Sequence, residues 1–471
     1  MTTNTHLSVL KAFLKDHPSI KHTLPTSPKF PSAKRVWNNS RHAEHTPLAV
    51  VQPQTPTDVA ALIKLAKLNS VPFTIRAGGH NLEGRALVDK ALLIDLRAFT
   101  SVSVSPDRKS ATVGGGILQQ ELGNELWKEG LATPTGLVPA VGYVGWAIYG
   151  GYGPFSAHWG LGVDQIIGAT VVNAEGELVT ADDDLLHGIR GAGGAFGVIV
   201  DLTIKVYPLT SLLAGAIIFD STDITKSFTT FNAAYANLLA TESLPPQLSI
   251  QQSFLNTPHG RLFAAIFVWS GAPSSTEEGL AWSAKIASLG PLLLNTVAPT
   301  TIPQLFDKNK DLVPENVFGS SCTFNIAPPV SSALAETIAK HLARLPSDPV
   351  TMFSVHELRG SSPSIGPQSH KSVFNGTARE PHSMLEILGF ATTDDARVES
   401  ENWAAQMAAD IEAVDGGIVL PSVYISLFNS TRAKSAEELL DKVYGEQKEI
   451  VRGLKRRFDP AGLFRLAVPD I

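Results

Sequence analysis

The stretch Arg76-Ala77-Gly78-Gly79-His80-Asn81 decides how this chain is interpreted. It follows the apolar and β-branched run 73–76, which predicts a short strand. Adjacent glycines let a backbone turn sharply and bring its N–H groups close to a ligand. A histidine in such a turn is usually a surface or hydrogen-bonding residue, so its role has to be judged from the rest of the chain.

Three further glycine clusters follow. They are Gly114-Gly115-Gly116, Gly150-Gly151-Tyr152-Gly153 and the segment from Gly191 to Gly197. The last is similar to a G-x-G-x-x-G fingerprint, but a helical pattern precedes it and the alternating strand pattern of 198–206 follows it. Because the dinucleotide fingerprint requires the strand first and the helix second, the order argues against a Rossmann fold. Glycine clusters still favour backbone nests that cradle phosphate groups.

Composition excludes several classes of protein. The chain is 44% hydrophobic and 17% charged, which excludes a disordered chain. Its length of 471 residues predicts about three domains. A net charge of −6 without a basic run argues against nucleic acid as a partner. The single cysteine, Cys322, excludes an intrachain disulfide and a multi-cysteine metal site, so we expect no metal.

The N-terminal sequence lacks a continuous apolar region and a small-residue cleavage site. No apolar run approaches the length needed to span a membrane. We therefore expect a cytoplasmic protein with no membrane partner. Separately, we expect the protein to be a monomer.

Several motifs together resemble a known family. The segment 76–80, with Pro134-Thr135-Gly136 and the segment 149–154, resembles the vanillyl-alcohol-oxidase-type flavoproteins with a PCMH-type FAD-binding domain, and within them the berberine-bridge-enzyme-like group. The resemblance covers residues 46–208 and resumes at 455–460, which is similar to the family's K-x-R-Y-D-P segment. It implies an FAD-linked oxidoreductase whose flavin is bonded covalently to the histidine of R-x-G-G-H, here His80.

The resemblance and the element pattern predict an α+β fold with a discontinuous FAD-binding domain. Residues 1–209 form its N-terminal part, 210–414 form an inserted substrate-binding domain, and 415–471 return to the FAD-binding domain. The insert should be an antiparallel sheet covered by helices. Its predicted strands are 212–219, 246–254, 261–269, 350–358 and 384–391, and its predicted helices lie near 224–239, 274–288 and 331–344.

The resemblance also implies a set of FAD-binding residues, one motif at a time. These are Arg76, Ala77, Gly78, Gly79, His80 and Asn81 at the pyrophosphate and the flavin ring; Thr135, Gly136, Val141, Gly142 and Gly145 beside the isoalloxazine; Gly150, Gly151, Gly153, His158, Gly160 and Asp164 in the next stretch; and Gly194, Phe196, Gly197 and Ile199 beside the adenine.

The chain departs from the family pattern in places. Val138 occupies the position where many members carry a second, cysteinyl anchor, so the flavin should be attached through His80 alone. Trp146 and Tyr149 replace smaller or different family residues, which implies a tighter ring pocket. The family's Y-x-N-Y reads Tyr424-Ile425-Ser426-Leu427, and the tyrosine often invoked as the catalytic base is missing.

Three residues are candidates for that base: Tyr424, Glu386 and Glu357. Strand alternation places Glu357 on one face of its strand and His356 on the other. Glu386 alternates with apolar neighbours, a pattern shared by pocket groups and edge residues. A general base must satisfy geometry before pKa, and the sequence supplies neither.

Val141 corresponds to a family position where valine is associated with access of O2 to the flavin and leucine with dehydrogenases. The resemblance therefore implies an oxidase that passes a hydride from a small alcohol, sugar or secondary metabolite to FAD, with O2 as the reoxidant and H2O2 as product. Two alternatives stay open, a flavin-dependent dehydrogenase and a redox-silent, flavin-bearing cyclase of secondary metabolism. Anaerobic bleaching of the flavin by a substrate separates redox from redox-silent use.

Overall fold

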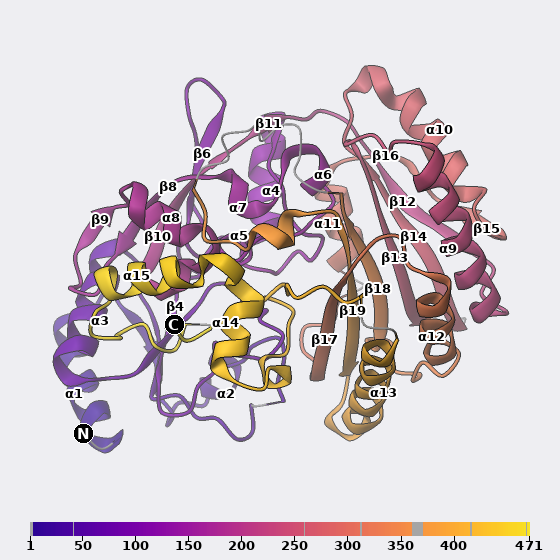
Figure 1. The fold of residues 1–471 in the computed structure, drawn as a ribbon. Helices are drawn as coiled ribbons and strands as arrows, with labels where there is room; N and C mark the ends of the chain where they lie inside the picture. The colour runs from indigo at the N-terminus through magenta and orange to yellow at the C-terminus, as the bar shows by residue number, and fades with distance from the viewer. Residues whose placement is uncertain are drawn as a thin grey trace.

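The computed structural model describes residues 3–40, 42–258, 260–310, 313–359, 371–414, 417–467 and 469–471. The chain builds two sheet systems that lie side by side (Figure 1). Two smaller sheets from the first 205 residues form one side, and a broad sheet from the middle of the chain forms the other. The predicted α+β class is confirmed.

The first sheet positions the His80 turn. Its strands, in spatial order, are β1 (Lys21–Thr23), β2 (Ala49–Gln52), β4 (Leu92–Asp95) and β3 (Phe73–Arg76), with β2 and β3 parallel to β4. Helix α3 (Pro56–Asn69) connects β2 to β3, and α1 (Thr3–Asp16) packs on it. Thr55 begins α3 with a capping box, because its side chain accepts from the Asp58 N–H while the Asp58 carboxylate accepts from the Thr55 N–H.

The second sheet is antiparallel throughout. Its order is β5 (Val102–Val104), β6 (Ser110–Gly114), β10 (Val198–Lys205), β8 (Ile166–Val172) and β9 (Leu178–Thr180). The segment from Gly191 to Gly197 follows α8 (Asp183–Ala192) and leads into β10, which is antiparallel to both neighbours. The prediction that these glycines do not open a Rossmann unit is confirmed.

Short helices start from the glycine turns between these sheets. They are α4 (Gln119–Lys128), α5 (Tyr143–Ala147), α6 (Ser156–Trp159), α7 (Gly162–Gln165) and the 3-10 turn η1 (Gly193–Ala195). A small ladder of β7 (Leu131–Ala132) and β11 (Tyr207–Pro208) closes this part of the chain.

The broad sheet has eight strands, all paired antiparallel. Its order is β15 (Leu292–Asn295), β12 (Leu212–Phe219), β14 (Gly260–Trp269), β13 (Leu248–Thr257), β18 (Met352–Leu358), β19 (His382–Ala391) and β17 (Phe318–Ile326), with β16 (Ala298–Thr300) beside β12. The five strands predicted for the insert all form. Strand β17 was not predicted, although it completes the site described below.

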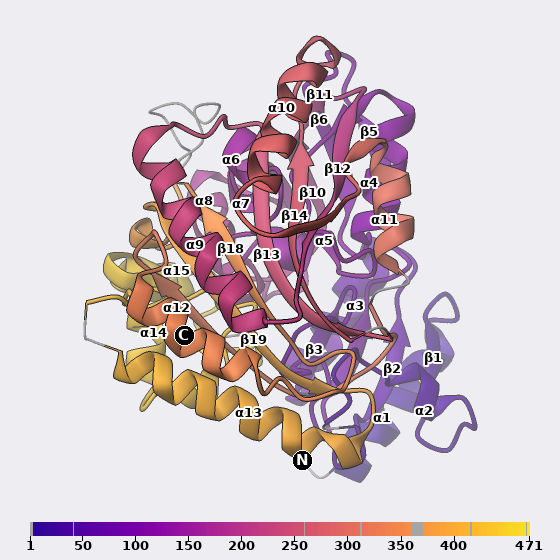
Figure 2. The ribbon, with the colours of Figure 1, turned by 90° about the vertical axis from the view of Figure 1, so that its right-hand side faces the viewer.

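Four of the described helices cover one face of this sheet, and strands β18, β19 and β17 leave their other face uncovered by them. The helices are α9 (Ile224–Thr241), α10 (Thr276–Ala287), α12 (Ser332–Leu342) and α13 (Asp394–Ala413) (Figures 1 and 2). Because strand residues alternate, Phe353, Val355 and Ile387 join the aromatic core under the helices. Ser354 and Glu386 then face the opposite way, toward the smaller sheets.

The C-terminal residues return to the first part of the chain, as Figure 1 shows in yellow. This part of the chain contains two helices, α14 (Ala436–Tyr444) and α15 (Lys448–Phe458). Gly445, which has a φ of 52°, ends α14 and separates it from α15. The Lys455 ammonium donates to the Ala195 carbonyl at 2.9 Å, fixing α15 beside η1. Among the described helices, none is long and apolar enough to cross a membrane.

Candidate functional site

Two glycine turns meet backbone to backbone beside His80. A Cβ added to Gly78 would lie 2.4 Å from both the Ala140 oxygen and the Gly142 nitrogen, and a Cβ on Gly142 would lie 2.6 Å from the Gly78 nitrogen. Only glycine fits at either position. The turn that follows β3 therefore rests directly on the start of α5.

Arg76 anchors this turn from below. Its side chain is buried, Nη2 lies 2.6 Å from Asp95 Oδ2, and Nη1 donates to the Arg35 carbonyl at 2.9 Å. The guanidinium is thus directed at β4. We infer that Arg76 supports the turn rather than a ligand.

The His80 ring stacks on Trp37, with centroids 5.5 Å apart and the planes 21° apart. Trp37 in turn meets Phe390 of β19 edge-on at 5.3 Å, which links the His80 turn to the broad sheet. No described residue forms a hydrogen bond with the His80 ring. Burial lowers the pKa of His80 to about 4, so its imidazole is neutral and keeps a nitrogen lone pair for bond formation.

Gly145 of α5 faces open space. It is exposed, and an added Cβ would meet no heavy atom within 4 Å. Alanine is about 1 kcal/mol more favourable than glycine inside a helix, so neither packing nor helix propensity favours a glycine here. A glycine facing open space next to the Gly78 and Gly142 turns fits the close approach of a bound group.

The cluster Gly150–Gly153 packs against the Thr135 segment and Phe374. Gly150 has a φ of +121° and its Cβ would lie 2.6 Å from the Phe374 ring, while a Cβ on Gly153 would lie 2.0 Å from the Thr135 oxygen. Gly136 continues the Thr135 segment. The structure therefore brings together three of the four motifs that the sequence analysis selected.

The side chains of His158 and Asp164 contact residues of the predicted insert, one through a hydrogen bond and the other through an ion pair. His158 Nδ1 lies 2.9 Å from Ser270 Oγ, and Asp164 Oδ1 lies 2.6 Å from Arg379 Nη1. Burial lowers the pKa of His158 to about 4. Gly160, with a φ of 94°, ends α6 between them. These side chains join the two sheet systems.

Gly194, Phe196, Gly197 and Ile199 form the passage from α8 into β10. Gly197 has a φ of +157° and its Cβ would lie 2.4 Å from Val171 Cγ1, so this passage is closely packed on β8. Phe196 and Ile199 are buried in the core of the second sheet. Nothing in these contacts shows an adenine site, which stays a prediction.

A carboxylate–histidine pair lies on the uncovered face of the broad sheet. Glu386 Oε2 is 2.9 Å from His356 Nε2 and accepts from Ser354 Oγ at 2.8 Å. The other carboxylate oxygen, Oε1, accepts no hydrogen bond from the described residues. Burial acts to raise the pKa of Glu386, but the hydrogen bonds and charge of His356 and the bond from Ser354 outweigh it, so the net pKa is lowered and the group is a carboxylate.

Tyr424 faces the third glycine turn. Its ring lies 4.6 Å from that of Tyr152, and its Cε2 would lie 3.3 Å from a Cβ on Gly150. Burial raises the pKa of Tyr424 to about 12, and the nearby polar groups of Ser426 and of the Gly151 backbone offset it only in part. The buried hydroxyl has no hydrogen-bond partner among the described residues.

Two further polar atoms on this face are buried without partners in the described structure, Thr323 Oγ1 and Asn325 Oδ1 of β17. Thr323 is paired in register with Glu386. Buried polar atoms usually have a hydrogen-bond partner, and a water or a ligand can supply one. The uncovered face is therefore a polar surface suited to hold a ligand.

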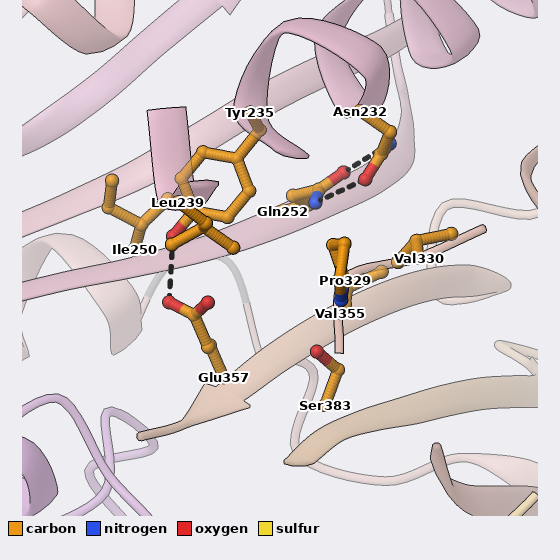
Figure 3. A pocket seen from close by; sticks show the side chains of 10 residues that line it. All are labelled: Asn232, Tyr235, Leu239, Ile250, Gln252, Pro329, Val330, Val355, Glu357 and Ser383. Atoms are coloured by element: carbon orange, nitrogen blue, oxygen red, sulfur yellow. Dashed lines mark hydrogen bonds between the residues drawn. The ribbon is translucent and has the colours of Figure 1, made fainter. Parts of the chain in front are cut away.

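The structure does not bring Glu357 to this face. Odd-numbered residues of β18 point under the helices, and Tyr235 of α9 donates to Glu357 Oε2 at 2.7 Å (Figure 3). The two residues line a cavity of about 20 Å³, which has room for one water molecule. Burial raises the pKa of Glu357. The proposal of Glu357 as a base is therefore wrong, because the sheet itself separates it from the uncovered face.

Sequence reasoning missed Trp37, Thr323 and Asn325. The alternation of Ser321, Thr323 and Asn325 with apolar residues is a strand signal that could have identified β17. Trp37 carried no such signal, because its contact with Phe390 joins residues far apart in the chain.

Comparison with known proteins supports the same assignment. A family model described as an FAD binding domain matches residues 47–182. Over 452 residues the chain is 30% identical to the FAD-linked oxidoreductase aurO of Gibberella zeae. The matched region covers 95% of this chain and 85% of aurO. The chain belongs to the FAD-linked oxidoreductases.

Two further proteins are similar over most of the chain. This FAD-linked oxidoreductase is 26% identical over 464 residues to (R)-6-hydroxynicotine oxidase of Paenarthrobacter nicotinovorans, covering 94% of each chain. A solved variant of berberine bridge enzyme in complex with (S)-reticuline shares the fold, with a TM-score of 0.80 at 17% identity, covering 98% of this chain and 100% of that one. The family resemblance drawn from the motifs is confirmed, and the protein is an oxidoreductase that uses FAD.

Proposed function

We propose that this protein is an oxidase that takes a hydride from a small alcohol, sugar or secondary metabolite and passes it to FAD attached through His80 alone. The observation that carries the proposal is a neutral imidazole that forms no hydrogen bond with any described residue and stacks on Trp37 beside the glycine turns. The names of two relatives, a hydroxynicotine oxidase and an enzyme in complex with (S)-reticuline, support a small organic substrate.

The residues around His80 fit FAD. Gly145 faces open space next to the place where Gly78 and Gly142 pack backbone to backbone, and Val141 lies in the same turn as Gly142. When bound, FAD accepts the hydride, while the protein supplies orientation and electrostatics. In this proposal Gly150, Gly151 and Gly153 bring further backbone to the flavin ring.

Attachment at a single residue is supported by the position of the only thiol. Val138 has no side chain that could form a thioether. Cys322 is buried among the residues under the helices, and Arg432 Nη1 lies 3.6 Å from its sulfur. That thiol is separated from the glycine turns by the broad sheet.

Glu386 is the better base of the two that remain. Its lowered pKa keeps it ionised at neutral pH, and Oε1 is left for a substrate O–H or N–H proton. The phenol of Tyr424, with a pKa of about 12, stays protonated and suits orientation of a substrate or flavin oxygen by hydrogen bonding. His356 holds the Glu386 carboxylate in place.

Reoxidation of the flavin tests the oxidase proposal without knowledge of the substrate. The holoprotein is photoreduced without oxygen and mixed with aerated buffer in a stopped-flow instrument while H2O2 is measured. Rapid return of the oxidised spectrum with formation of H2O2 supports an oxidase. Reoxidation as slow as that of flavin dehydrogenases would favour a dehydrogenase or the redox-silent cyclase.

A further inference from the structure

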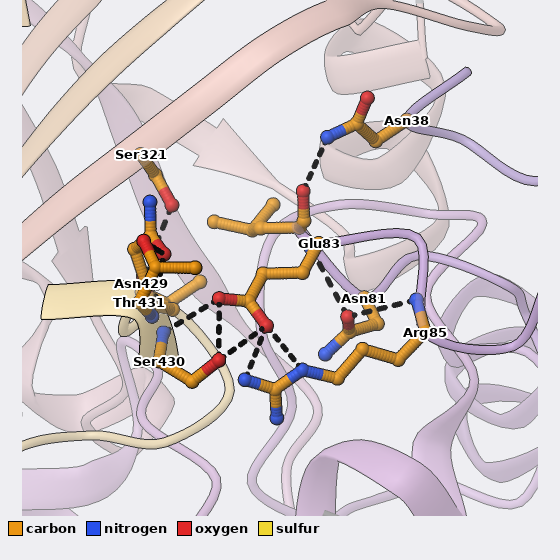
Figure 4. A network of polar contacts seen from close by, with 10 residues as sticks. Asn38, Asn81, Glu83, Arg85, Ser321, Asn429, Ser430 and Thr431 are labelled. Atoms are coloured by element: carbon orange, nitrogen blue, oxygen red, sulfur yellow. Dashed lines mark hydrogen bonds and ion pairs between the residues drawn. The ribbon is translucent and has the colours of Figure 1, made fainter. Parts of the chain in front are cut away.

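A half-buried carboxylate ties the His80 turn to a distant segment of the chain. Glu83 lies three residues after His80, and its side chain is 14% exposed. The Ser430 N–H donates to Glu83 Oε1 at 2.6 Å, and Ser430 Oγ lies 3.1 Å from Oε2 (Figure 4). Arg85 forms an ion pair with the same carboxylate, so both oxygens are held.

The turn that carries Glu83 is itself rigid. Asn81 Oδ1 accepts from the Glu83 N–H at 3.1 Å and from the Arg85 N–H at 3.2 Å. Asn38 Nδ2 donates to the Leu82 carbonyl and, at 2.9 Å, to the Gly319 carbonyl of β17. Glu83 therefore projects from a fixed point next to His80.

Ser430 begins the 3-10 turn η4 (Ser430–Arg432), directly after the segment that carries Tyr424. That segment folds on itself, because the Leu427 and Phe428 N–H groups donate to the Tyr424 carbonyl at 3.1 and 3.0 Å. Ser321 Oγ donates to the Leu427 carbonyl at 3.1 Å. The Tyr424 segment is thus held by β17 on one side and by Glu83 on the other.

We propose that Glu83 is a positioning residue that fixes the Tyr424 phenol relative to the flavin-bearing His80 turn. The inference rests on the proposed function, because it assumes that the flavin is held at His80. An ion pair with Arg85 alone would satisfy the Glu83 charge. The additional bonds to Ser430 join two segments about 350 residues apart, and this junction sets where the phenol lies.

The test is a double-mutant cycle on the visible circular dichroism of the bound flavin. Tyr424→Phe is made in the wild-type, Glu83→Gln, Ser430→Ala and Glu242→Gln backgrounds. Glu83→Gln removes the charge, and Ser430→Ala removes only the hydroxyl and keeps the main-chain bond. Glu242, an exposed carboxylate paired with Lys285, is the matched control.

We expect Tyr424→Phe to change the flavin spectrum in the wild-type and Glu242→Gln backgrounds, and most of that change to be lost with Glu83→Gln. Ser430→Ala should give an intermediate loss and keeps the test valid if Glu83→Gln does not fold. If Glu83 had only a structural role, Glu83→Gln would lower Tm and leave the effect of Tyr424→Phe intact, and that result would overturn the inference. An absent effect of Tyr424→Phe in the wild type would also overturn it, whereas slow reoxidation by O2 would overturn only the proposed oxidase.

Discussion

His356 Nε2 lies 2.9 Å from Glu386 Oε2, and the two residues come from neighbouring strands of the broad sheet. Ser354 donates to the same oxygen at 2.8 Å. All the bonds that the described residues make to this carboxylate thus fall on one oxygen. The other oxygen is left for a ligand on the uncovered face.

Glu386→Gln should slow reduction of the flavin by about 10²–10⁴-fold, the usual contribution of a general base. The amide can still accept a hydrogen bond from Ser354, so flavin content should stay close to that of the wild type. The measurement is anaerobic stopped-flow bleaching with any compound that reduces the wild-type flavin. Glu357→Gln makes the same change on the neighbouring strand under the helices and should leave the rate unchanged. A Glu386→Gln variant that reduces its flavin at the wild-type rate would remove Glu386 as the base.

The lowered pKa of Glu386 makes a prediction for stability against pH. A carboxyl with a lower pKa in the folded state than in the unfolded state stabilises the fold above its ordinary value, here 4.5, and loses that contribution as pH falls through the lowered value. The Tm difference between wild type and the Glu386→Gln variant should be constant from pH 7 to about 5 and narrow below about 4.5. Scanning calorimetry over this range measures it, and a difference that widens on acidification would contradict the assignment.

Val141→Leu should slow reoxidation of the reduced flavin by O2. Leucine adds one methylene in the turn between Ala140 and Gly142. One methylene is enough to block a narrow path of O2 to the flavin. A tenfold slower rate would correspond to about 1.4 kcal/mol in the barrier. Overpacking can also destabilise the fold by about 1–3 kcal/mol, so flavin content is measured first. Val179→Leu on β9 is the control, and equal rates for wild type and Val141→Leu would refute the prediction.

Two glycine variants separate ligand contact from packing. Gly145→Ala should leave Tm of the flavin-free protein unchanged or raised, because its Cβ meets no protein atom, yet should lower flavin content. Gly150→Ala should lower Tm with or without flavin, because its φ is +121° and its Cβ would lie 2.6 Å from Phe374. Full flavin loading of the Gly145→Ala variant would show that α5 does not line the cofactor site.

Local patterns predicted most of the elements. The apolar and β-branched run 73–76 and the alternation of 198–206 identified β3 and β10, because each pattern follows from the geometry of its own element. Strand β17 was missed although its polar uncovered face gives the polar–apolar alternation that marks a half-buried strand. The boundaries at 209 and 414 stay predictions.

The site depended on contacts that no local pattern contains. The motifs around His80 were identifiable from short glycine spacings, but the role of Arg76 depended on Asp95, and the exclusion of Glu357 depended on Tyr235 of α9. The bond between Glu83 and Ser430 is set by how two distant segments pack. Such pairings follow from tertiary structure, which a single sequence does not display.

The most direct test of the central claim is the location of the flavin after acid precipitation. Purified wild-type protein should give a yellow pellet and a colourless supernatant, because the bond to His80 survives denaturation. The His80→Ala variant should release whatever flavin it binds into the supernatant. Flavin found entirely in the wild-type supernatant, or an equally yellow pellet from His80→Ala, would contradict attachment through His80.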